Sequence, residues 1–207
     1  MSSRSTSAER RRRAAGLGAV LAVVGLLGGC NSLVAQNPPS AMKPVNAVYR
    51  VDEPRLMLQG YDLVAYFTDR QAVPGNPQLR VEHEQVVFFF ASPLHLELFK
   101  KDPRKYQPAY HGYDAMRMVF AIPERADPQQ WQFVDGRLFF FADAASMAAF
   151  DLDRAGNTVL ADRYWTDEVQ GHFSEWQRTR RLIDNVPHYK SRDELAREVA
   201  AAKAKPG

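Results

Sequence analysis

Two twelve-residue stretches decide the expected fold of this chain: FFFASPLHLELF at Phe88–Phe99 and FFFADAASMAAF at Phe139–Phe150. They align without a gap when the sequence is shifted by 51 residues. In each stretch, three phenylalanines precede a residue that commonly caps a helix N-terminus, Ser92 or Asp143. We interpret the pair as a structural repeat in which a strand leads directly into a helix. Chance similarity is the alternative, because phenylalanine and alanine are common in this chain.

Turn signals place a second strand before each of these stretches. Residues 79–84 and 86–91 are expected to form two strands joined by a tight turn. In the second copy, Asp135 and Gly136 lie between apolar runs, which is a strong signal for a two-residue hairpin turn. Pro93 follows the capping serine at the position that helices favour for proline. The sequence therefore predicts two β-hairpin-to-helix units.

Helical patterns dominate the end of the chain. Apolar residues recur at helical spacing over residues 154–184, where Gly156 and Gly171 are candidate interruptions. Ser191 and Glu194 have the spacing of a capping box, so a last helix is expected to begin there. Together with the two hairpin-to-helix units, these C-terminal helices predict the α+β class.

The first thirty residues have the layout of a bacterial lipoprotein signal. Four arginines at residues 10–13 precede an apolar run over residues 14–29, which is shorter than the roughly 20 residues of a membrane-spanning helix. Leu-Gly-Gly before Cys30 resembles the lipobox, so Cys30 is the expected lipid-attachment residue, with palmitate among its acyl groups. An ordinary cleaved signal peptide with a stray cysteine is the alternative. Asn31 resembles the pattern that directs lipoproteins to the outer membrane.

Cleavage before Cys30 would change both the charge and the chemistry of the chain. Of the 27 Lys and Arg, five precede Cys30, as does one of the 24 acidic residues, so 22 basic and 23 acidic residues remain. A near-neutral domain lacks the basic footprint of a nucleic-acid-binding protein. Cys30 is the only cysteine, so its acylation leaves no thiol for a disulfide, a thiolate metal site or a cysteine nucleophile.

Several blocks between residues 58 and 165 resemble the YHS-domain family in their order and spacing. The resemblance implies a small α+β core related to treble-clef metal-binding modules, and a link to metal handling, often of copper. Many relatives have a GGYC block, in which this chain has His111 in place of a glycine and Asp114 in place of the cysteine. The matching blocks are GYDLVAYF at 60–67, FFAS at 89–92 with Phe99, DPRKYQPAY at 102–110, VDGRL at 134–138, and ADRYW at 161–165 with Asn157.

Four segments are therefore expected along the chain. Residues 1–29 form the lipoprotein signal peptide, and residues 30–46, which contain three prolines among small polar residues, form a flexible tether. A compact YHS-like α+β domain follows over residues 47–165, beginning with an extended segment. Residues 166–207 form a C-terminal helical extension outside the usual family pattern.

A nitrogen–oxygen metal site is one candidate for the chemistry of this domain. His111 and Asp114 would supply two ligands, His95 and Met116 could join them, and such donors suit copper or zinc. The alternative assigns Asp114 to a turn or a helix cap and His111 to the surface. Met116 and Met118 then pack in the core, sharing one face if residues 116–120 form a strand. The phenylalanine triplets likewise fit either a pocket wall or a strand buried on both faces.

Sequence motifs favour binding over catalysis. The chain contains no nucleophile elbow, phosphate-binding glycine loop, H-E-x-x-H or dinucleotide fingerprint, and Asp62 suits a turn or helix cap. The expected function is a non-enzymatic, lipid-anchored envelope module at the outer membrane, facing the periplasm, which binds a small ligand or a metal ion such as copper. The alternative is an interaction lipoprotein that docks another envelope protein through its C-terminal helices. Nucleic acid is not an expected partner.

Overall fold

The structure is a computed structural model that describes residues 45–48 and 55–204. The chain divides into two compact parts, Met1–Pro38 and Pro39–Gly207, and every described residue belongs to the C-terminal part. The expected signal peptide, the lipid-accepting Cys30 and most of the tether therefore lie outside the described residues. Within the two described ranges, no helix combines the length and the apolar character that crossing a bilayer requires.

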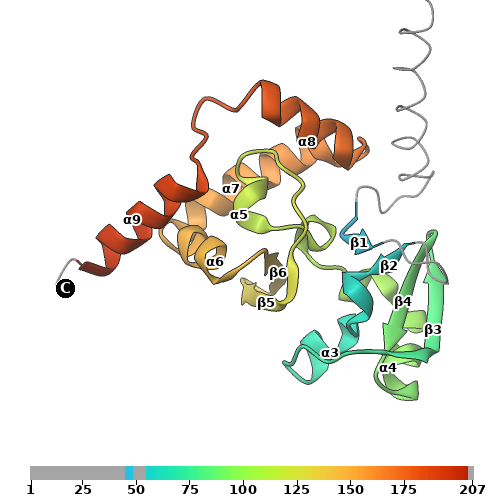
Figure 1. The fold of residues 1–207 in the computed structure, drawn as a ribbon. Coiled ribbons are helices and arrows are strands. Elements are labelled where there is room, and N and C mark those ends of the chain that lie inside the picture. The colour runs from blue at the N-terminus through green and yellow to red at the C-terminus, as the bar shows by residue number, and fades with distance from the viewer. Residues whose placement is uncertain (1–44, 49–54, 205–207) are drawn as a thin grey trace, which may run out of the picture. The chain divides into compact units, whose positions relative to one another are not determined.

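The described residues form a mixed α+β fold, as the sequence predicts (Figure 1). The strands are β1 Ala47–Val48, β2 Leu56–Met57, β3 Asn76–His83, β4 Val86–Phe90, β5 Asp127–Val134 and β6 Arg137–Phe141. One sheet has the order β1-β2-β4-β3, with β2 and β4 parallel, and β5 and β6 form a separate hairpin. The helices are α3 Leu63–Thr68, α4 Pro93–Lys101, α5 Ala115–Met118, α6 Ala144–Asp151, α7 Arg154–Tyr164, α8 Ser174–Ile183 and α9 Arg192–Ala204.

Two hairpin-to-helix units are confirmed, at β3-β4-α4 and at β5-β6-α6. Their turns, at residues 84–85 and 135–136, have positive φ angles at both central residues, which is the type I′ geometry that matches the twist of paired strands. Ser92 and Asp143 cap α4 and α6 as predicted, because each side chain accepts a hydrogen bond from the backbone N–H three residues further on.

Gly136 in the second hairpin turn is required for its backbone conformation alone. Its φ is +79°, and an added Cβ would meet nothing within 4 Å. Gly136→Ala is therefore expected to lower the free energy of unfolding by about 1–2 kcal/mol, the cost of a left-handed conformation. Gly136→Asn should cost less, because asparagine tolerates this region of φ and ψ. Denaturant unfolding of both variants measures the difference, and equal losses would contradict it.

Each unit begins further upstream than the sequence comparison predicts. A Gly-Tyr-Asp triplet at residues 60–62 precedes α3, and the same triplet at residues 112–114 precedes α5. Both glycines have left-handed φ angles, +88° and +84°, and both aspartates cap the helix that follows. A unit therefore runs from a Gly-Tyr-Asp corner through a short helix and a hairpin to a longer helix.

Strand β6 contributes side chains to the hydrophobic clusters of both units. Phe139 and Phe141 pack against Phe150 of α6, with ring centroids 5.7 Å and 5.5 Å from that of Phe150. Leu138 and Phe140 belong instead to the hydrophobic cluster of the first unit. Because alternate side chains of a strand point to opposite faces, β6 is buried on both faces, and this prediction is confirmed.

Phe99 of α4 has the same position in the first unit as Phe150 has in the second. Its ring centroid lies 4.7 Å from that of Phe88 and 5.2 Å from that of Phe90, both on β4. Both terminal phenylalanines of the repeated stretches therefore anchor a helix to the strand before it.

The prediction that residues 116–120 could form a strand is wrong. This stretch forms α5 and the turn after it. The cause is Asp114, whose side chain accepts a hydrogen bond from the backbone N–H of Arg117 at 3.0 Å and thereby starts a helix. Met116 and Met118 are nevertheless buried in the core, as predicted.

C-terminal helices continue from the second unit. A π-helical segment, Trp165–Val169, follows α7, and Gly171, with φ +82°, interrupts the helical stretch as predicted, whereas Gly156 lies inside α7. The capping box before α9 is confirmed, because the Ser191 N–H donates to the Glu194 carboxylate at 2.7 Å and the Glu194 N–H to the Ser191 hydroxyl at 3.3 Å. Helix α9, at the red end of the chain in Figure 1, packs against α6.

Candidate functional site

A buried aspartate organises each unit, and in the first unit it is Asp62. Its carboxylate accepts hydrogen bonds from the backbone N–H groups of Val64 and Ala91, at 2.8 Å and 2.7 Å. The same carboxylate lies 2.6 Å from Nδ1 of His95. Asp62 therefore caps α3, as predicted, and ties it to the start of α4.

Asp114 has the same role in the second unit, where Ser146 takes the place of His95. Its carboxylate accepts hydrogen bonds from the N–H groups of Arg117 and Ala142, at 3.0 Å and 2.8 Å, and from the Ser146 hydroxyl at 2.7 Å. Ser146 lies 51 residues after His95, the same shift that relates the repeated stretches. The predicted alternative for Asp114, a helix cap, is confirmed.

Burial changes the proton affinity of Asp114. The residue is 0 % exposed, and the loss of water raises its pKa, while hydrogen bonds from Ser146, Arg117 and Ala142 offset part of that rise. The folded protein therefore holds this proton more tightly than the unfolded chain. The part of the stability that comes from this raised pKa is fully present below the ordinary aspartate pKa of about 3.9 and is lost as the pH rises through the folded value.

Replacing the carboxyl group with an amide tests this pH dependence. Asp114→Asn keeps the shape of the side chain and removes its ionisation. The free energy of unfolding of the variant, relative to that of the unaltered protein, is expected to rise as the pH increases from about 3.5 to 7. Denaturant titrations of both proteins at each pH measure this difference. A difference that stays constant across that range would contradict the raised pKa.

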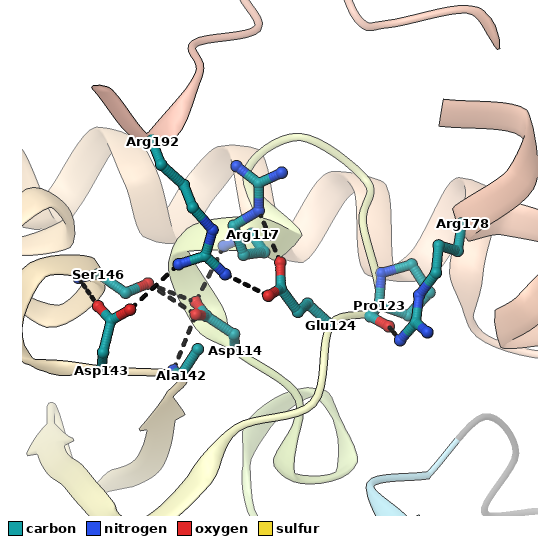
Figure 2. A network of polar contacts seen from close by, with 9 residues as sticks. All are labelled: Asp114, Arg117, Pro123, Glu124, Ala142, Asp143, Ser146, Arg178 and Arg192. Carbon is teal, nitrogen blue, oxygen red and sulfur yellow. Dashed lines mark hydrogen bonds and ion pairs between the residues drawn. The ribbon is translucent and has the colours of Figure 1, made fainter. Parts of the chain in front are cut away.

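Figure 2 shows a ring of polar contacts that connects Asp114 to the C-terminal helix. Nε of Arg117 donates to Glu124 at 3.0 Å, Glu124 also pairs with Arg192 of α9, and Nη1 of Arg192 donates to Asp143 at 3.1 Å. Ser146 closes the ring, because its N–H donates to Asp143 and its hydroxyl donates to Asp114. Because its members come from α5, the loop after it, the start of α6 and α9, the ring holds these four segments together. In order, they are Asp114, Arg117, Glu124, Arg192, Asp143 and Ser146.

A cavity of about 620 Å³ lies beside this ring, between the loop after α5 and helix α8. Among the described residues, four arginines and a single carboxylate, Glu124, line it. Two of these arginines, Arg117 and Arg181, are buried, with side chains 9 % and 4 % exposed, and are called the buried pair. The other two, Arg125 and Arg178, are exposed and are called the exposed pair. Apolar and neutral polar side chains complete the lining: Ile122, Leu182, Asn185 and Tyr189.

Both buried arginines keep a donor that is not in use. Arg181 pairs with Glu168 and donates to the backbone carbonyl of Asp184 at 2.9 Å, but its buried Nε has no hydrogen-bond partner among the described residues. Arg117 reaches Glu124 only through Nε, and its buried Nη1 has no hydrogen-bond partner within the described part of the chain. Figure 2 shows both terminal nitrogens of Arg117 directed away from Glu124. A buried donor without a partner costs about 1–3 kcal/mol, which marks Arg117 as a group with unused binding capacity.

The predicted metal ligands are not gathered into one centre. His95 contacts Asp62 in the first unit, Asp114 contacts Ser146 in the second, and Met116 is 3 % exposed in the core. Among residues 45–48 and 55–204, no three His, Cys, Asp or Glu side chains form a group that could hold a metal ion. This donor set does not fit the metal site that the YHS resemblance implies.

His111 differs from the expectation of a surface position. It is only 9 % exposed, and its ring lies 4.9 Å from that of Trp165, edge to face. The backbone explains the difference, because His111 has a φ of +48° in the 3-10 turn Ala109–Gly112, and the chain downstream covers it.

The cavity arginines were missed in the sequence, although part of the signal was present. Arg178 and Arg181 are three residues apart in a segment predicted to be helical, so they share a face. Arg117 lies three residues after Asp114, which caps a helix. Glu124 and Arg125 lie in a loop without any periodic pattern, and only the folded chain brings them to α8.

Ring and cavity together make up the candidate site. The ring positions Arg117 and Glu124, and both side chains also line the cavity. The cavity combines open volume with an excess of positive charge, which suits ligand binding. In comparisons with known proteins, no family model, no curated protein and no solved structure matches this chain.

Proposed function

We propose that this protein is a lipid-anchored envelope protein that acts as a non-enzymatic binding module, held at the outer membrane through Cys30 and facing the periplasm. The observation that carries the binding role is the arginine-lined cavity of about 620 Å³. Ligand sites in proteins are mostly preformed cavities of roughly 300–1,000 Å³ with a few convergent polar groups. The lipoprotein-like start of the sequence supports the location.

Contacts around the cavity favour binding over chemistry. Its carboxylate, Glu124, is shared between Arg117 and Arg192, so it serves as a structural anion. The polar ring holds the wall at α5 and its loop in place before any ligand arrives. A preorganised wall reduces the entropy lost on binding, which is the property expected of a binding module.

Metabolic labelling tests the anchor. Cells that express the protein and are grown with an alkyne fatty acid should attach the label to the unaltered chain and to a Ser32→Ala control. Cys30→Ala should abolish labelling, because it removes the only thiol in the chain. A labelled Cys30→Ala protein, or an unlabelled native one, would contradict the anchor.

A second candidate function is docking of another envelope protein through the C-terminal helices. Helix α8 exposes Trp176, Leu182 and Ile183, which are 61 %, 81 % and 84 % exposed. Several large apolar side chains on one exposed helix are typical of interaction surfaces. A photo-crosslinking residue at position 176 should capture one envelope protein repeatedly in living cells, and the same residue at Glu97 on α4 should not. Equal capture from both positions would contradict docking through α8.

A further inference from the structure

We propose that the arginine-lined cavity binds a phosphate-type oxyanion, supplied either as free phosphate or as the head group of an anionic phospholipid. The inference rests on the binding function proposed above and names its ligand class. It follows from three features of the cavity: its charge, its unused donors and its arrangement of buried and exposed arginines.

The lining of the cavity carries a clear excess of positive charge. In the part of the chain that the structure describes, four arginines and one carboxylate, Glu124, line the cavity, and Glu124 is already paired with Arg117 and with Arg192 of α9. Arg181 has its own acidic partner, Glu168. Arginine presents several N–H donors in a planar fork that matches the oxygens of phosphate, so a phosphate group suits this lining better than a neutral ligand.

One of the unused donors is Nη1 of Arg117. It is buried and has no hydrogen-bond partner among residues 45–48 and 55–204. The rest of the guanidinium is held in place, because Nε donates to Glu124 at 3.0 Å, and the cation lies 5.7 Å from the ring centres of Phe120 and Tyr189. Arg117 lines the cavity, so an anion there would lie beside a guanidinium that has donor capacity to spare.

The exposed pair, Arg125 and Arg178, comes from separate parts of the chain that line the same cavity. Arg125 follows Glu124 in the loop after α5, and Arg178 is on α8, where its Nη2 donates to the backbone carbonyl of Pro123 at 3.3 Å. Two exposed cations in the lining attract an anion, and the buried Arg117 adds a positive charge that solvent screens less. The cavity therefore has the groups needed both to attract an anion and to hold it.

Calorimetric titration of the full chain, purified in a non-ionic detergent, with inorganic phosphate tests the proposal. The double variant Arg125→Gln/Arg178→Gln removes the exposed pair without touching the polar ring, so it should fold normally and bind phosphate at least about tenfold more weakly. A matched control, Arg154→Gln/Arg163→Gln, removes the same charge from α7, where both side chains are more than half exposed and neither lines the cavity. Its affinity for phosphate should equal that of the unaltered protein.

A second arm identifies the source of the phosphate group. Dihexanoyl phosphatidylglycerol, a soluble phospholipid, is titrated alongside dihexanoyl phosphatidylcholine and inorganic phosphate. Binding of phosphatidylglycerol at least about tenfold tighter than that of phosphate indicates a lipid head group, and weaker or equal binding indicates a free phosphate compound. Either result supports the shared chemistry, provided that the double variant weakens it.

Two outcomes would overturn the proposal. One is the absence of heat with both inorganic phosphate and phosphatidylglycerol, and the other is equal affinity in the double variant and the unaltered protein. Neither outcome bears on the anchor at Cys30, which is tested by fatty-acid labelling in cells. Conversely, an unlabelled protein that binds phosphate would leave the oxyanion site standing and remove only the proposed location.

Discussion

Asp114→Ala is expected to lower the free energy of unfolding by about 3–5 kcal/mol, a large part of the 5–15 kcal/mol typical of a folded domain. The substitution removes an acceptor that is 0 % exposed and leaves the N–H groups of Arg117 and Ala142 without a partner. It also leaves the hydroxyl of Ser146 without this acceptor. The loss exceeds that of an ordinary helix cap, because one carboxylate satisfies donors from two elements at once. Urea titration followed by circular dichroism measures the change.

Asp167→Ala provides the matched control for this prediction. Asp167 has a side chain that is 60 % exposed, and its only described ion pair, with Arg163, has an N–O distance of 3.8 Å. Such a surface pair contributes little, so the control should lie within about 0.5 kcal/mol of the unaltered protein. If the free energies of unfolding of Asp114→Ala and of this control differ by less than about 1 kcal/mol, the polar ring does not stabilise the second unit.

Local signals were enough to predict the two hairpin-to-helix units. The turn at residues 135–136 is set by an Asp-Gly pair, and the starts of α4 and α6 are set by Ser92 and Asp143, whose side chains bond the backbone three residues away. The interactions that decide these features span only a few residues, so they can be read in a short window. Phe99 and Phe150 follow from the same windows, because helical spacing turns them back toward the strand.

The start of each unit was present in the sequence but harder to recognise. The Gly-Tyr-Asp triplets at 60–62 and 112–114 are 52 residues apart, whereas the phenylalanine stretches are 51 apart, so no single shift aligns both. The first unit has one residue more between its triplet and its hairpin than the second. Local preference also misleads at residues 116–120, where methionine, valine and phenylalanine fit a strand and the cap at Asp114 imposes a helix instead.

The cavity and the polar ring depend on contacts between residues far apart in the chain. Glu124 and Arg192 are 68 positions apart, and Arg192 also reaches Asp143, 49 positions away. No periodic pattern encodes such pairs, because they depend on how α9 returns to α6. A charged side chain at an expected surface position gives no signal of which partner it will find, so the candidate site appears only in the folded chain.

Phe150→Ala is expected to cost about 3–5 kcal/mol, because the ring fills a fully buried space between α6 and the strand before it. Its neighbours Phe139 and Phe141 lie on β6, and the other face of this strand packs in the first unit. Phe99→Ala removes the equivalent ring from α4 and should cost a similar amount. Thermal or denaturant unfolding, followed by both near-ultraviolet and far-ultraviolet circular dichroism, measures the losses.

The shared strand makes a further prediction about these two variants. Since Leu138 and Phe140 of β6 belong to the core of the first unit, while Phe139 and Phe141 belong to that of the second, neither unit can lose its core alone. Each variant should therefore unfold in a single transition at both wavelengths, at a lower denaturant concentration than the unaltered protein. Leu152→Ala, at a position that is 42 % exposed just after α6, serves as the control and should change little. Two separated transitions in Phe150→Ala would show that the units fold independently and that burial of β6 on both faces does not couple them.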